Sequence, residues 1–147
     1  KFKLNELGDI AYISGLLHDI GKIVLKGLHP KAMDKLNKIC VEKGISTGIL
    51  EHLLEGANHA QIGAKMASKW DIPDNIVKII KFHHNPLGAE EDVREINKII
   101  YLAHILYKYL NNLDDALDFE KEILESFNIK SQEQLQDLKV YIRNMMR

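Results

Sequence analysis

The chain has 147 residues, of which 46% are hydrophobic, which is enough for one packed domain and too few for two ordinary ones. Its 20 Lys and Arg residues nearly balance its 21 Asp and Glu residues, so the net charge of −1 excludes a strong general attraction to nucleic acid or to an anionic membrane. The single cysteine, Cys40, excludes an internal disulfide and favours the reducing cytoplasm, and no run approaches the roughly 20 apolar residues that span a bilayer.

The spacing of apolar residues predicts an all-α fold, because they recur every three or four positions and no segment alternates as a half-buried strand does. A first helix runs through Leu16 and Leu17, carries His18 and Asp19 near its end, and is expected to break or tighten at Gly21. Pro30 opens the next helix, which Gly44 ends. A short helix over residues 48–54 is expected to follow.

Asn58 is expected to cap a helix that runs to Trp70. This places His59 in the first helical turn, where the exposed N–H groups and the positive end of the helix dipole favour anions. Another helix stops at Asn85-Pro86, because the residue before a proline disfavours the helical conformation. One face of that helix carries four residues expected to point inward: Ile76, Ile79, Ile80 and His83.

A longer helix, from about residue 91 to residue 110, is expected to bury one apolar stripe. The stripe consists of Ile96, Ile99, Ile100, Ala103, His104 and Tyr107. Two further amphipathic helices follow, the first over about residues 114–127 and the second, after a capping box that begins at Ser131, over about residues 132–146.

We expect one cytoplasmic domain over residues 1–147, because only the short polar stretch Asn111-Asn112 interrupts the helical pattern. The chain begins at Lys1 without an initiator methionine, so N-terminal helices of the domain are expected to precede it. Neither nucleic acid nor a membrane is an expected partner.

Histidines and one aspartate lie inside or at the ends of the predicted helices and could converge on one cavity. The expected metal ligands are His18, Asp19, His59, His83, His84 and His104. Imidazole with carboxylate, and no cysteine, suits a divalent transition metal such as iron, manganese, zinc, cobalt or nickel, in a centre that keeps open positions. Taken singly, each histidine is more often a surface or hydrogen-bonded core residue, in which case no metal is bound, and His29 and His52 are expected at the surface. Lys22, beside His18 and Asp19, is a candidate for holding a phosphate.

Three motifs occur in order: Gly15-Leu-Leu-His-Asp-Ile-Gly-Lys-Ile-Val-Leu25, Asn58-His-Ala-Gln-Ile-Gly63 and Ile79-Ile-Lys-Phe-His-His-Asn-Pro86. Together they resemble the HDOD domain, the HD-related output domain of bacterial signalling proteins and a branch of the HD superfamily of metal-dependent phosphohydrolases. The resemblance covers about residues 10–110, and the C-terminal helices, residues 113–147, are similar to the tail of such domains. It implies an HD-type helical bundle and a role in signal transduction, with another signalling protein or domain as the partner.

Two departures from the catalytic HD pattern bear on activity. Active members finish the site with an aspartate where this chain has His104, and dinuclear members carry a further histidine that would fall before Lys1. In the similar proteins that hydrolyse cyclic di-GMP, a Gly-Tyr-Pro loop follows the paired histidines. This chain has Asn85-Pro-Leu-Gly at that place, so the resemblance does not support this activity. The resemblance therefore favours a regulatory output domain. The alternative is an active phosphohydrolase acting on a nucleotide or phosphoester, in which Lys22 is the catalytic cation that stabilises phosphoryl charge.

Overall fold

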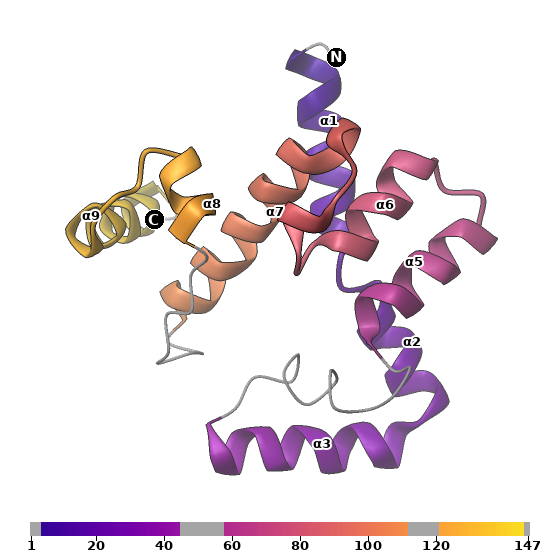
Figure 1. Ribbon diagram of the computed structural model, residues 1–147. Helices are drawn as coiled ribbons and strands as arrows, with labels where there is room; N and C mark the ends of the chain where they lie inside the picture. The colour runs from indigo at the N-terminus through magenta and orange to yellow at the C-terminus, as the bar shows by residue number, and fades with distance from the viewer. Residues whose placement is uncertain (1–3, 45–57, 112–120, 146–147) are drawn as a thin grey trace. The chain divides into compact units, whose positions relative to one another are not determined.

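The computed structural model describes residues 4–44, 58–111 and 121–145, and no strand occurs among them (Figure 1). The predicted all-α fold is confirmed. The helices are α1 (Leu4–Leu17), α2 (Ile20–Leu28), α3 (Pro30–Lys43), α5 (His59–Lys69), α6 (Asp74–Phe82), the 3₁₀ turn η1 (Pro86–Gly88), α7 (Glu91–Leu110), α8 (Lys121–Ser126) and α9 (Gln132–Met145). None of the described helices is long and apolar enough to cross a membrane.

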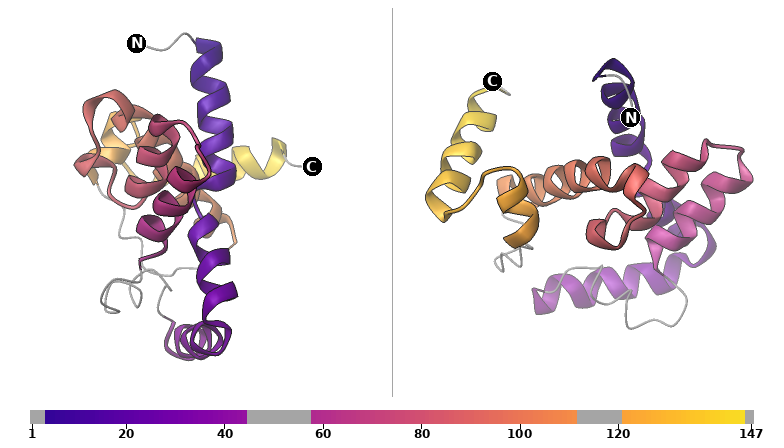
Figure 2. Two further views of the ribbon diagram at one scale, coloured as in Figure 1. Left: turned by 90° about the vertical axis from the view of Figure 1, so that its right-hand side faces the viewer. Right: turned by 45° about the horizontal axis from the view of Figure 1, so that its top comes forward.

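The chain divides into two compact units, Lys1–Tyr101 and Leu102–Arg147, and α7 runs from the first into the second. In the first unit, α5 packs against both α2 and α6, and α1 packs against α6. A short turn separates α1 from α2, as the two further views show (Figure 2). In the second unit, the hydroxyl of Tyr109 on α7 donates a hydrogen bond of 2.8 Å to Gln136 on α9. A single domain over residues 1–147 stays a prediction.

The core of the first unit contains two clusters of buried side chains, and Ile10 of α1 packs against both. The first cluster consists of Ile79, Ala89, Val93, Ile96 and Ile100. The second consists of Ala64, Ala67, Ile76 and Ile80. The inward face predicted for α6 and the histidine that follows it is confirmed, because its four members are at most 5% exposed. These clusters connect α6 to its neighbours on both sides of the helix.

The buried stripe of α7 differs from the predicted one. Ile99 is 42% exposed and Tyr107 is 62% exposed, and Ala103 is exposed as well. Ile96 and Ile100 of the predicted stripe are buried as expected. The other buried residues of the helix are Val93, Asn97, Tyr101 and Leu106. Apolar residues form two adjacent stripes on α7, and contact with side chains of α1 and α6 decides which stripe is buried.

The break after α1 also differs from the prediction. α1 ends at Leu17, His18 and Asp19 form the turn, and Gly21 lies inside α2. A Cβ atom on Gly21 would lie 1.9 Å from the carbonyl oxygen of His59. Gly21 is therefore needed where α2 meets α5, and the break occurs without it.

Capping residues define several helix ends as predicted. Asn58 accepts a hydrogen bond of 2.8 Å from the N–H of Ala60, and Gly44 ends α3 with a φ of 62°. At the start of α9, Ser131 accepts a hydrogen bond of 3.2 Å from the N–H of Gln134. Three predicted features lie outside the described residues: the helix over residues 48–54, His52, and the first part of the helix over residues 114–127.

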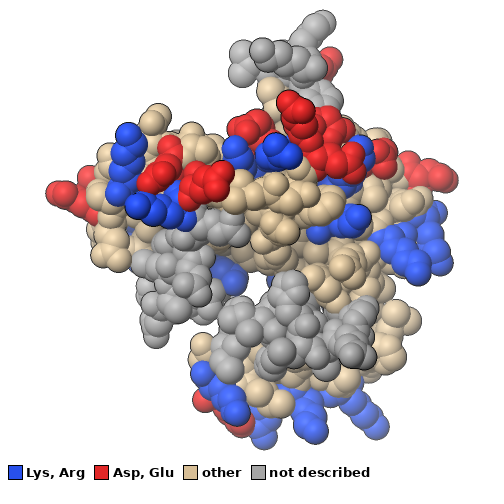
Figure 3. Space-filling view, in the orientation of Figure 1, with Lys and Arg blue, Asp and Glu red and all other residues tan. Residues whose placement is uncertain are grey.

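Acidic and basic side chains are intermixed where α6 meets the start of α7 (Figure 3). The ammonium of Lys78 on α6 lies 2.7 Å from Glu90, 3.2 Å from Asp74 and 3.3 Å from Asp92. Hydrogen bonds with Glu90 and Asp74 raise the pKa of Lys78 above its usual range. The charges therefore compensate one another locally, which agrees with the near-zero net charge of the chain.

Candidate metal centre

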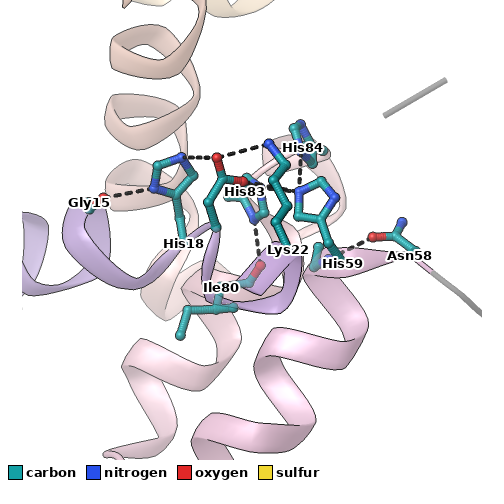
Figure 4. A network of polar contacts seen from close by, with 10 residues as sticks. Gly15, His18, Lys22, Asn58, His59, Ile80, His83 and His84 are labelled. Atoms are coloured by element: carbon teal, nitrogen blue, oxygen red, sulfur yellow. Dashed lines mark hydrogen bonds and ion pairs between the residues drawn. The ribbon is translucent and has the colours of Figure 1, made fainter. Parts of the chain in front are cut away.

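Three chain segments of the first unit meet at one point (Figure 4). The turn between α1 and α2 contributes His18 and Asp19, and the first residue of α5 is His59. His83 and His84 directly follow the last residue of α6. Because α5 packs against both α2 and α6, side chains from three separate motifs become neighbours.

The nitrogen and oxygen atoms of this cluster are close enough to share one ion. One such atom from each of Asp19, His59, His83 and His84 lies within 4.8 Å of the other three. The Nε2 atom of His59 lies 3.2 Å from Oδ1 of Asp19. The same nitrogen lies 3.3 Å from Nε2 of His83 and 2.9 Å from Nε2 of His84. An ion bonded to imidazole at about 2.0–2.1 Å separates neighbouring ligand atoms by about 2.9–3.4 Å, so these spacings fit a transition metal.

Backbone carbonyls orient two of the imidazoles. Nδ1 of His83 donates a hydrogen bond of 2.6 Å to the carbonyl of Ile80. Nδ1 of His18 donates one of 2.7 Å to the carbonyl of Gly15. A carbonyl only accepts, so each of these rings carries a proton on Nδ1 and turns its Nε2 toward the cluster. This arrangement is typical of histidines that bind metal through Nε2.

Several hydrogen-bond acceptor atoms of the cluster compete for few protons. Burial lowers the pKa of His83 to about 3, so its ring is neutral at physiological pH. Nε2 of His59 has three close neighbours, and one proton on that nitrogen can serve only one of them. Oδ1 of Asp19 is buried and receives no well-aligned hydrogen bond within the described part of the chain. A cation among these atoms would satisfy all of them, so the residues present fit a divalent metal ion.

Asp19 remains ionised despite its burial. Burial alone would raise the pKa of Asp19, but contacts with His59 and Lys22 outweigh it and hold the pKa well below its usual range. The ammonium of Lys22 lies 2.9 Å from Oδ2 of Asp19. The centre therefore has one fixed negative charge beside the neutral ring of His83.

The structure brings together most of the predicted site residues. Five predicted ligands, His18, Asp19, His59, His83 and His84, lie in this cluster together with Lys22. His104 lies on α7 in the other unit and is half-buried, and its role as a ligand stays a prediction. His29 is exposed, as predicted.

Two glycines that position the site were not predicted. A Cβ atom on Gly63 would lie 3.1 Å from the backbone nitrogen of Gly21 and 3.2 Å from Cγ2 of Ile80. Gly21 and Gly63 thus allow the backbones of α2 and α5 to touch beside Asp19 and His59. A signal was present in the sequence, because each glycine lies inside one of the motifs, two residues after Asp19 or Gln61.

In the metal-free protein, the free energy of unfolding is expected to fall as the pH drops below about 6.5. The pKa of His83 is about 3 in the folded protein and 6.5 in the unfolded chain, so between these values the unfolded chain binds more protons. Stability therefore rises with pH across this window and levels off above it, with a slope from this group of up to about 1.4 kcal/mol per pH unit. Urea unfolding of chelator-treated protein at several pH values measures the slope.

The matched variants are His83→Gln, which should lose this part of the slope, and His29→Gln, which alters an exposed histidine and should keep it. Equal slopes in the wild type and in His83→Gln would contradict the assignment of this proton to His83.

Two curated proteins are similar to this chain over part of their length. Over 125 residues, or 85% of this chain, the sequence is 30% identical to an uncharacterized protein of Treponema pallidum, of which the match covers 24%. Over 58 residues, or 40% of this chain, it is 38% identical to a putative glycyl-radical enzyme activating enzyme of Methanocaldococcus jannaschii, of which the match covers 22%. The chain thus spans about a quarter of the length of these curated relatives. No solved structure matches significantly.

More than half of the chain matches one known domain family. The profile of the HDOD domain matches residues 1–86, which contain all three motifs and every residue of the cluster in Figure 4. This chain belongs to the HDOD domain family.

Proposed function

We propose that this chain is a metal-binding regulatory domain of a larger signal-transduction protein, and that it acts on a partner domain without turning over a phosphoester. The observation that carries the proposal is the convergence of Asp19 with His59, His83 and His84. When bound there, iron, manganese, zinc, cobalt or nickel would join the ends of α2, α5 and α6. The ion would thus stabilise one arrangement of these helices, and a partner domain could recognise that arrangement.

Two observations favour regulation over catalysis. The ammonium of Lys22 lies 2.9 Å from Oδ2 of Asp19, so it is engaged within the protein rather than directed at a phosphate. The matches cover only about a quarter of each curated relative, which supports a place within a multidomain protein. The partner in this proposal is therefore another signalling domain or protein.

A metal-dependent phosphohydrolase is the second candidate. It is favoured by partial solvent access on one side of the cluster, where the side chains of Asp19, Lys22 and His18 are 34%, 33% and 18% exposed. A bound ion would supply Lewis acidity toward a phosphoester or nucleotide. Lys22 would have to leave Asp19 to neutralise charge on the phosphoryl oxygens.

The deciding experiment loads chelator-stripped protein with Mn²⁺ and measures amide hydrogen exchange and phosphoester hydrolysis on the same sample. We expect slower exchange at the joined ends of α2, α5 and α6, because the ion ties them together. We also expect no turnover of cyclic di-GMP or bis-p-nitrophenyl phosphate. Turnover at about 1 s⁻¹ or faster that His18→Ala abolishes would replace the regulatory proposal by the phosphohydrolase. Exchange that Mn²⁺ leaves unchanged would contradict the metal-dependent output.

A further inference from the structure

The two carboxylate oxygens of Asp19 face different partners. Oδ1 lies 3.2 Å from Nε2 of His59 and 3.7 Å from Nε2 of His83. Oδ2 lies 2.9 Å from the ammonium of Lys22 and 3.5 Å from Nε2 of His18. The carboxylate therefore separates two cation positions, one at each oxygen.

The Oδ1 position has a full set of protein ligands. His59, His83 and His84 supply three imidazole nitrogens, and Oδ1 of Asp19 supplies the fourth atom. Three nitrogens and one oxygen are sufficient for one divalent transition metal, with any remaining positions open to water.

The Oδ2 position is already covered by a positive charge. Lys22 follows Asp19 by three residues in the first turn of α2, so the helix itself directs the side chain back to the carboxylate. His18, whose Nδ1 donates to the carbonyl of Gly15, presents its Nε2 to the same oxygen. A second divalent ion held by Oδ2 and His18 would lie in contact with the ammonium, and like charges at that separation repel strongly.

We infer that Lys22 serves as the second cation of this centre and limits it to one divalent ion. This inference rests on the proposed metal centre and adds its stoichiometry. Lys22 is a positioning residue in this role, because it acts through the carboxylate of Asp19. Replacing it with a neutral side chain opens the Oδ2 position to a second, weaker ion held by Asp19 and His18, with water completing its coordination.

The test is native mass spectrometry of the full chain at saturating Mn²⁺, which counts the ions per polypeptide. We expect one ion in the wild type, two in Lys22→Leu and in a second neutral variant, Lys22→Met, and one again in the double variant Lys22→Leu/His18→Ala. The matched control is Lys26→Leu, which removes an exposed lysine one turn further along α2 and should keep one ion. Circular dichroism verifies that each variant is folded.

Each result has a distinct meaning. Two ions in the wild type, or one ion in both neutral variants of Lys22, overturns this inference and leaves the metal centre in place. A wild type that binds no ion overturns the proposed metal centre and this inference with it. A second ion that persists in the double variant with His18→Ala shows that the ion does not use the Oδ2 position, and this also overturns the inference.

Discussion

Gly21→Ala is expected to destabilise the first unit by about 3 kcal/mol or more and to abolish metal binding. The added Cβ atom would lie 1.9 Å from the carbonyl oxygen of His59 and 2.8 Å from the backbone nitrogen of Gly63. Both contacts are with backbone, so no side chain can rotate away, and α2 must separate from α5. That movement carries Asp19 away from His59. Urea unfolding and Mn²⁺ binding measured on the same variant test both effects.

Two other glycines supply a graded comparison. Gly27 lies on the same helix, but a Cβ atom there would meet nothing within 4 Å, so Gly27→Ala should stabilise the protein by about 0.5–1 kcal/mol. A Cβ atom on Gly63 would approach its neighbours to 3.1 Å, so Gly63→Ala should give a loss smaller than that of Gly21→Ala. If Gly21→Ala stabilised the protein as Gly27→Ala is expected to do, this result would contradict the close contact between α2 and α5.

Asp19→Asn is expected to weaken the affinity for Mn²⁺ by about 100-fold or more, since even residues outside the ligand set change metal affinity by about 10–100-fold. The substitution keeps the shape of the side chain and removes the single negative charge among the imidazoles. At an ion concentration of about 100 times the wild-type Kd, bound metal adds about 2.7 kcal/mol to stability, and the variant should lose most of this gain. Competition with a chromophoric chelator gives the affinity, and thermal unfolding with and without Mn²⁺ gives the stabilisation.

The control for this measurement is Asp9→Asn, which removes an exposed carboxylate from α1 and changes the net charge by the same amount. It should leave the affinity within about 2-fold of the wild type, because water and salt screen an exposed charge. An Asp19→Asn variant that binds Mn²⁺ with less than about 10-fold loss would show that the carboxylate is not a ligand.

The local structure of this protein could be predicted from its sequence because short-range rules decide it. Apolar spacing predicts the helices, Asn58 and Ser131 begin two of them through their side-chain oxygens, and Gly44 ends α3. The ligand residues could also be anticipated, because three motifs of the sequence carry imidazole and carboxylate groups, but their convergence depends on the packing of α5 against α2 and α6.

Only the tertiary structure decided which faces are buried and how the ligands are oriented. Spacing could not choose between the two apolar stripes of α7, because the choice depends on contact with residues such as Leu7 and Phe82. It could not show that Gly21 is needed for a contact between helices, because His59 is its neighbour only after α2 and α5 have packed. Nor could it show that Lys22 covers one oxygen of Asp19. The physical reason is the same throughout: a sequence pattern reports which groups a helix presents, and packing decides what those groups meet.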